Sequence, residues 1–187
     1  MTRVTRWILV ALVGAAICTL GDHLHATHGV LTYAHVAFWN QAWWVFPLFF
    51  VASLAAVFGA RVTRKMFRAA PLAPNDARRI AADGIAFATA YAMTSFTHEA
   101  ANATLAVLVA FWIARMLAGA PRWLVVLSLA NAALGPLVEA AISSTGAFTY
   151  DHPDFMLVAR WLPGIYLHVA PISARLEALL PGAAETS

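Results

Sequence analysis

The stretch "ANATLAVLVAFWIARMLAGAPRWLVVLSLANAALG", from Ala101 to Gly135, contains two apolar runs separated by a short segment that carries Arg115 and Arg122. A helix that crosses a membrane needs roughly 20 mostly apolar residues, and both runs approach that length. Because the connection is short, the two helices are expected to be antiparallel neighbours. The pattern therefore predicts a helical membrane protein.

The composition of the whole chain agrees with that prediction. Of its 187 residues, 61% are hydrophobic and 11% are charged, and the mean hydropathy is +0.72. Six segments have the length and character of a membrane span: 4–20, 41–60, 80–97, 101–118, 123–145 and 161–180. No linker separates them, so residues 1–187 are expected to form one all-α domain, a polytopic six-helix bundle. With a single cysteine, Cys18, the chain has no intramolecular disulfide.

The distribution of positive charge predicts the orientation of the bundle. The chain has 12 Lys and Arg residues, and all except Arg160 fall at the N-terminus, in alternate loops or at the end of the last span. Under the positive-inside rule, both termini are cytoplasmic. The net charge of +3 then reflects topology and contact with anionic lipid, and no nucleic-acid partner is expected. Ala-rich helices with almost no Lys suit a bacterial plasma membrane.

The last external loop is unusually polar for this chain. It reads "YDHPDFMLVARWLPG", from Tyr150 to Gly164. Asp154 is placed to cap a short turn or to pair with Arg160, and Pro163 falls in the first turn of the last helix, where its missing N–H costs little. The loop is either a capped re-entry into the membrane or the rim of a ligand site.

Two motifs resemble a known family. The segment "PDFMLVARWLPGI" is similar to the motif that opens the last helix of the Insig (insulin-induced gene) proteins, and "AWWVFP", Ala42 to Pro47, is similar to a Trp-Trp-Val-Pro-Pro stretch in their second helix. The resemblance extends from about Trp39 to Leu180. It implies a small helical bundle with a cavity open to the lipid, which binds a sterol or a diacylglycerol-like amphiphile in a sensor or scaffold role.

The chain also departs from the family pattern. Animal members retain sterol-regulatory partners in the endoplasmic reticulum through an Asp between spans four and five, whereas Arg115 to Arg122 contains no acid. His168 stands where the family has little bulk. A membrane lipid is therefore the expected partner, while any protein partner and the oligomeric state stay open.

The motifs and the polar residues within the spans together give the candidate ligand-binding set. It comprises Trp43, Trp44, Pro47, Phe50, Asn102, Asn131, Glu139, Phe155, Trp161, Pro163, Tyr166 and His168.

Glu139 is the most unusual residue of this set, because an acid in hydrocarbon must face the interior, be protonated or be paired. Counting along the helices places Glu139 and His168 both in the outer half of the bundle, where they are able to meet. Glu139 and His168 then either form a hydrogen bond between helices or contact the polar head of a lipid. The same two interpretations apply to the amides of Asn102 and Asn131.

Phe155 and Trp161 are expected to pack toward the bundle as an apolar lip. The wall that faces this lip is then formed by Trp43, Trp44 and Phe50 at the start of the second span. In this arrangement, the last external loop is the rim of a cavity that lipid can enter.

The histidines offer a competing interpretation. All seven, including those of "DHLHATH" from Asp22 to His28, are predicted on the external side, where imidazoles and carboxylates suit zinc or iron or a response to pH. No recognised metal-ligand spacing supports a metal site, and no catalytic set or cofactor motif is present. Two alternatives to a lipid-binding protein are carried forward: a lipid-modifying membrane enzyme that uses Glu139, His168 and the external acids, and a small transporter. No convincing internal repeat supports the transporter.

Overall fold

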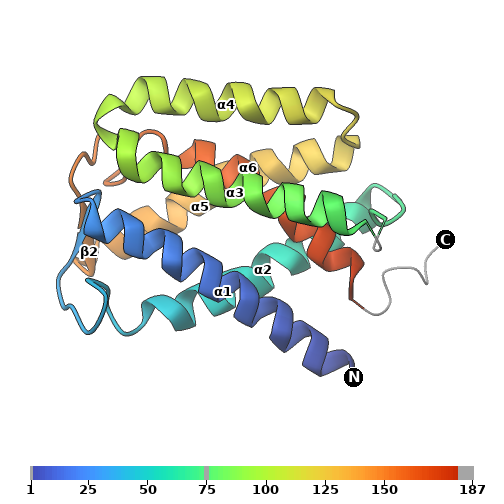
Figure 1. The fold of residues 1–187 in the computed structure, drawn as a ribbon, viewed down its shortest axis with the longest axis horizontal. Coiled ribbons are helices and arrows are strands. Elements are labelled where there is room, and N and C mark those ends of the chain that lie inside the picture. The colour runs from blue at the N-terminus through green and yellow to red at the C-terminus, as the bar shows by residue number, and fades with distance from the viewer. Residues whose placement is uncertain (1, 74–75, 181–187) are drawn as a thin grey trace.

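The computed structural model describes residues 2–73 and 76–180 and is mostly helical (Figure 1). In chain order its elements are α1 (Arg3–Thr27), β1 (Leu31–Tyr33), α2 (Val45–Met66), α3 (Ala77–Thr97), η1 (His98–Ala100), α4 (Ala101–Leu117), α5 (Arg122–Ser143), β2 (Phe148–Tyr150) and α6 (Leu162–Ala178).

Each of the six segments predicted from hydropathy coincides with a helix, with shifted ends. The largest shift is in α1, which continues to Thr27, so that Asp22, His23 and His25 lie in its last turns and not in a loop as predicted. Asp76 caps α3 by accepting a hydrogen bond from the backbone of Arg79.

By length and composition, four helical segments of the described chain are able to cross a membrane: Arg3–Thr27, Val45–Met66, Ala77–Leu117 and Arg122–Ser143. The third contains α3, η1 and α4, and the chain turns back on itself between the two helices (Figure 1). With 17 residues, α6 is shorter than each of these four segments.

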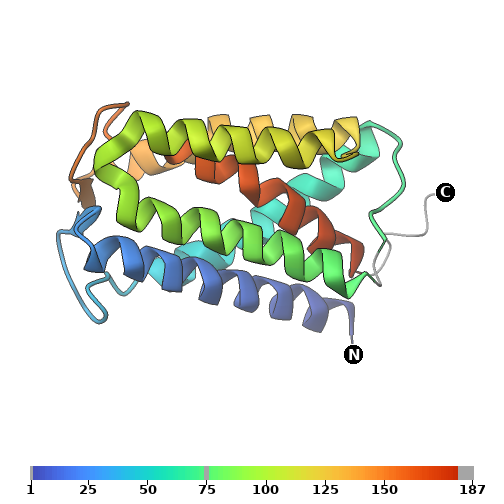
Figure 2. The same cartoon turned by 45° about the horizontal axis from the view of Figure 1, so that its top comes forward.

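The helix α6 runs through the middle of the bundle and contacts α2, α3, α4 and α5 (Figure 2). Small side chains make this position possible, since Ala170, Ala174 and Ala178 repeat every fourth residue on one face and are buried. Helix α4 packs mainly against α6 and α3. The expected packing of α4 against α5 is therefore not its main contact.

A two-stranded antiparallel sheet covers one end of the bundle, which the all-α prediction missed. Leu31 pairs with Tyr150, Thr32 with Thr149, and Tyr33 with Phe148. Alternate side chains of each strand point into the protein, giving a buried, exposed, buried pattern. We refer to this as the sheet end. The start of α1 and the end of α6 lie together at the opposite, arginine end (Figure 1).

The units α1–β1–α2 and α5–β2–α6 are two copies of one structural repeat. The strand and the second helix of each unit are separated from their counterparts by the same number of residues, 117. β1 begins at residue 31 and β2 at 148, and α2 begins at 45 and α6 at 162. The register of the sheet is symmetric about the pair Thr32 and Thr149. The sequence-based interpretation that there is no convincing internal repeat is therefore wrong.

Backbone details repeat as well. The glycines before the two strands, Gly29 and Gly146, have φ of 74° and 78°. Each strand is followed by a tight turn closed by an isolated bridge, Phe38 with Gln41 and Phe155 with Val158. At the same spacing, the following pairs of residues are identical: Gly29 and Gly146, Thr32 and Thr149, Tyr33 and Tyr150, His35 and His152, Phe38 and Phe155, Ala42 and Ala159, Trp44 and Trp161. Because the two copies run in the same direction, their pseudo-two-fold axis passes through the sheet and along the bundle.

Candidate functional site

The first copy of the repeat holds a buried carboxylate beneath the sheet. Asp22, near the end of α1, is 4% exposed. Its Oδ2 accepts hydrogen bonds from the hydroxyl of Tyr33 at 2.7 Å and from Nε2 of Gln41 at 2.6 Å. The same amide nitrogen of Gln41 also donates to the carbonyl oxygen of Thr19 at 2.9 Å. These contacts link α1, β1 and the segment that leads into α2.

The second copy holds Glu139 in the same way. Its Oε2 accepts a hydrogen bond from the hydroxyl of Tyr150, and its Oε1 accepts one from Tyr166 of α6 at 2.6 Å. Gly135, one turn earlier on α5, makes room for Tyr166, because a Cβ at this position would overlap the tyrosine ring. A glycine in mid-helix thus serves the contact between α5 and α6.

Asp22 and Glu139 are equivalent positions in the repeat, and so are the tyrosines that donate to them. Each carboxylate precedes its tyrosine by eleven residues. The sheet end therefore contains a symmetric pair of carboxylates, each held by a phenol from the adjoining strand. We call Asp22, Glu139, Tyr33, Tyr150, Tyr166 and Gln41 the carboxylate cluster.

Aromatic rings surround the cluster. The ring of Tyr33 lies 5.5 Å from that of Trp44 and 5.9 Å from that of Phe148, and Tyr150 lies 6.2 Å from Trp161. Burial raises the pKa of both strand phenols, Tyr33 and Tyr150, with the neighbouring carboxylate as a further cause. Both hydroxyls therefore remain neutral donors at physiological pH.

His25 borders the same region. Its Nε2 lies 2.8 Å from the hydroxyl of Thr94 on α3, and its ring lies 4.7 Å from Tyr91 and 5.4 Å from Trp161. Because the hydroxyl of Thr94 itself donates to the carbonyl of Tyr91, it serves as the acceptor for His25. Within residues 2–73 and 76–180, no group of three or more His, Cys, Asp or Glu side chains is arranged to hold a metal ion.

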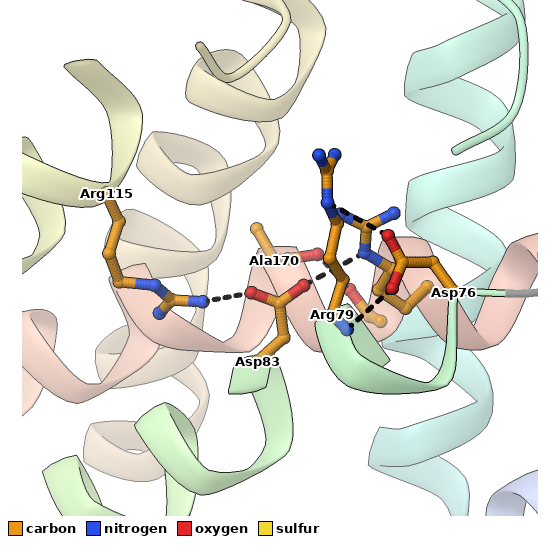
Figure 3. A network of polar contacts seen from close by, with 7 residues as sticks. Asp76, Arg79, Asp83, Arg115 and Ala170 are labelled. Carbon is orange, nitrogen blue, oxygen red and sulfur yellow. Dashed lines mark hydrogen bonds and ion pairs between the residues drawn. The ribbon is translucent and has the colours of Figure 1, made fainter. Parts of the chain in front are cut away.

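His168 lies in a different network from Glu139, which corrects the prediction that the two meet. Arg115 donates from Nη1 to Nδ1 of His168 at 2.9 Å, which leaves the proton on Nε2, and this nitrogen donates to the carbonyl of Leu108. Arg115 also reaches Asp83 at 2.6 Å (Figure 3). Asp83 in turn accepts a hydrogen bond from Arg175, so this network joins α3, α4 and α6.

A second ion network lies at the arginine end. Arg64 of α2 donates from Nε and Nη2 to the two carboxylate oxygens of Glu177 on α6, at 3.1 and 3.0 Å. Arg61 donates to the same carboxylate at 3.1 Å and stacks over the ring of Trp7 at 5.0 Å. Arg61 and Arg64, which charge counting assigned to a loop, are therefore buried side chains of α2. The bidentate geometry is the strong form of this interaction.

The remaining predicted residues divide between the core and the surface. Trp161 is fully buried at the start of α6 and is not an interfacial side chain, whereas Phe155 is 45% exposed and Trp43 is 68% exposed. The expected lip of Phe155 and Trp161 is therefore present only in part. Trp44, Phe50 and Pro163 are half-buried and Pro47 is exposed.

Two amides and one ion pair complete the list of predicted contacts. Asn131 is half-buried, and its Nδ2 has no partner within the described residues. Asn102 is exposed and accepts a hydrogen bond from Arg160, which also pairs with Asp154 at 3.4 Å as predicted.

Sequence reasoning missed four of the six residues of the carboxylate cluster. Tyr33 and Gln41 were not considered, Asp22 entered only with the histidines as a metal candidate, and Tyr150 appeared only as the start of a loop. The signal that would have found them is the repeated pattern Gly-x-x-Thr-Tyr-x-His-x-x-Phe, which begins at Gly29 and again at Gly146. Each copy is preceded by one acid, seven residues before the glycine.

The fold and the site together define a multi-pass helical membrane protein with a polar cluster enclosed at one end of the bundle. No protein-family model matches the chain. It is 27% identical over 190 residues to the INSIG protein homolog of Mycolicibacterium vanbaalenii, which covers 95% of this chain and 87% of the relative.

Two solved structures share the fold. The crystal structure of MvINS, a mycobacterial Insig homolog from Mycobacterium vanbaalenii, superposes with a TM-score of 0.78 at 23% identity, covering 94% of this chain and 93% of that one. A cross-linked trimer of a cysteine variant of MvINS gives the same TM-score and coverage at 22% identity. The resemblance inferred from the two tryptophan motifs is confirmed: the chain is similar in sequence to a bacterial INSIG protein homolog and shares the fold of MvINS.

Proposed function

We propose that the chain is a lipid-binding protein of the sensor or scaffold type, which takes the polar head of an amphiphile between α5 and α6. The observation that carries the proposal is a polar row on α5. Asn131, Gly135 and Glu139 are spaced by four residues and share one helix face. The amide Nδ2 of Asn131 is buried and has no partner in the part of the chain that the structure describes, and both Asn131 and Glu139 are only half-buried residues.

The neighbouring residues of α5 face outward. Leu134, Leu137 and Val138 are exposed, as expected for side chains in contact with acyl chains. An amphiphile with its tails against these residues would bring a hydroxyl or ester group to Asn131, where an unsatisfied donor in an apolar medium gains most from a partner. A sterol or a diacylglycerol-like lipid has this chemistry, as the family resemblance implies.

Native mass spectrometry of the full chain, extracted in mild detergent, tests the proposal through the lipid that it retains. We expect Asn131→Leu and Glu139→Gln to retain clearly less lipid than the parent protein, while Glu99→Gln, an exposed acid in η1, retains as much. Thermal unfolding establishes that each variant is folded. If a folded Asn131→Leu protein retains the same lipid in the same amount, the polar row does not hold the head group.

We further propose that all six helices cross the membrane, with the arginine end in the cytoplasm. At 17 residues, α6 spans roughly 25 Å, less than a hydrocarbon core of about 30 Å. Four helices surround α6, however, so its length need not match the lipid. The trimer reported for MvINS makes a homotrimer the first assembly to test by cross-linking.

Transport is the second candidate function, because the repeat of α1–β1–α2 in α5–β2–α6 is a feature of many transporters. A transporter exposes its central site to each side of the membrane in turn, whereas a lipid sensor needs access from the bilayer only. Asn131→Cys in a Cys18→Ser background distinguishes the two. Modification by a water-soluble thiol reagent from both sides favours transport, and protection from both sides favours the sensor.

A further inference from the structure

The two copies of the repeat differ in one respect that bears on a second site. In the second copy, both oxygens of Glu139 accept hydrogen bonds from tyrosines. In the first copy, the hydrogen bonds that Tyr33 and Gln41 donate to Asp22 both go to Oδ2. The two carboxylates are therefore satisfied differently although the backbone around them is the same.

The residues beside Asp22 are also more polar than their counterparts. The positions of Thr19 and Gln41 correspond in the repeat to Pro136 and Val158, which are buried and apolar. The second copy of the repeat therefore accepts apolar side chains at both positions. Buried polar atoms cost free energy unless a partner satisfies them.

One side-chain oxygen atom of each of these two residues, Thr19 and Gln41, lacks a partner in the described structure. The side-chain Oε1 of Gln41 and Oγ1 of Thr19 are both buried with no hydrogen bond, in residues that are 1% and 5% exposed. The Gln41 amide is held in place by its Nε2, which donates to Asp22 and to the Thr19 carbonyl. Reversing the amide would put its oxygen against the carboxylate, so Oε1 is correctly the unpaired atom.

The charge of Asp22 is likewise unbalanced among its contacts. Among the described residues, the groups that donate to it, a phenol and an amide, are neutral. A buried carboxylate with neutral donors alone is costly in a membrane protein and calls for a proton or a cation. A carboxylate, an amide oxygen and a hydroxyl oxygen are the ligands that hard cations prefer.

We propose that Asp22, Gln41 and Thr19 form a binding site for a small monovalent cation, with Na⁺ as the probe. The carboxylate of Asp22 balances the charge, Oε1 of Gln41 and Oγ1 of Thr19 supply neutral oxygens, and Tyr33 holds the carboxylate in place. The site joins α1 to the segment before α2, so an ion bound there stabilises the sheet end. This inference does not rest on the proposed lipid site, which uses α5 and α6.

The test is a titration of the full chain in detergent with NaCl, in which N-methyl-D-glucamine chloride keeps the ionic strength constant. We expect Tm to rise with Na⁺ and to saturate, because a ligand that binds the folded state stabilises it by mass action. The variants Thr19→Val and Gln41→Val, which bring the first copy closer to the second, should weaken the apparent affinity by at least about tenfold. Thr149→Val, on the exposed face of β2, should leave it unchanged.

The quantity compared between the parent and each variant is the change of Tm with Na⁺ concentration, and not Tm itself. A variant that is merely less stable therefore still shows whether it binds Na⁺. Equal effects of Na⁺ and N-methyl-D-glucamine would overturn the proposal, as would a saturable Na⁺ effect that survives in Asp22→Asn. Stabilisation that follows pH and not Na⁺ would assign a proton to Asp22 and would overturn it too. Direct binding of Na⁺ by isothermal titration calorimetry should show the same order of affinities.

Discussion

At the scale of single residues, Gly135 sets the geometry of the second carboxylate. A methyl group at this position would overlap the Tyr166 ring, which donates to Glu139. We expect Gly135→Ala to displace the ring, to break this hydrogen bond and to destabilise the protein by about 1–3 kcal/mol, although alanine favours a helix. Thermal unfolding in detergent, followed by tryptophan fluorescence, measures the effect.

The matched control for this prediction is Gly59→Ala on α2. A Cβ at Gly59 would lie 3.8 Å from a methyl group of Leu127, an ordinary contact. This variant should be neutral or slightly more stable than the parent, because alanine loses less backbone entropy on folding. Equal losses of stability in the two variants would mean that the fit of Tyr166 is not the cause.

The strand tyrosines predict how stability depends on pH. Burial raises the pKa of Tyr33 and Tyr150 in the folded protein above the value of about 10 in the unfolded chain. Their contribution is fully present below pH about 10 and is lost as pH rises, because only the unfolded state then releases the phenol protons.

Denaturation followed between pH 8 and pH 11 tests this dependence. Tyr33→Phe should reduce the slope of stability against pH above about pH 10. A slope that is unchanged in this variant would mean that other groups cause the alkaline loss.

At the scale of elements, α6 depends on a buried ion pair. Glu177 is fully buried and its partner Arg64 is 1% exposed. Glu177→Gln leaves the guanidinium without its counter-charge, so we expect a loss of roughly 3–5 kcal/mol and poor recovery of folded protein. Arg79→Gln removes an exposed ion pair with Asp76 and should have little effect on the unfolding temperature. Similar unfolding temperatures for both variants would show that the Glu177 pair is not important for stability.

At the scale of the whole molecule, the topology predicts where the two ends of the bundle lie. A reporter at the N-terminus and one inserted between Val36 and Ala37, in the exposed turn after β1, should report opposite sides of the membrane. The physical basis is the charge asymmetry, since Arg160 is the exception among 12 Lys and Arg residues. Reporters that agree with one another would refute the six-span arrangement.

Hydropathy and charge by themselves determined the helical segments and the class of protein. An apolar run of about 20 residues has few alternatives to a helix in a membrane, because every backbone polar group must be satisfied within the segment. The same local logic identified Glu139 as an interior acid, Pro163 as a residue of the first turn, and the pairing of Asp154 with Arg160.

The tertiary structure alone decided which polar groups meet. Asp22 and Tyr33 are close in sequence, but Gln41 joins them only because α1 and the start of α2 pack together, and Glu139 meets Tyr166 only because α6 lies in the centre. His168, which sequence counting placed in the same half of the bundle as Glu139, instead meets Arg115, since a long arginine side chain reaches inward from the helix end. Local pattern fixes the depth of a residue along a helix, whereas the rotation and neighbours of that helix follow from packing against distant segments.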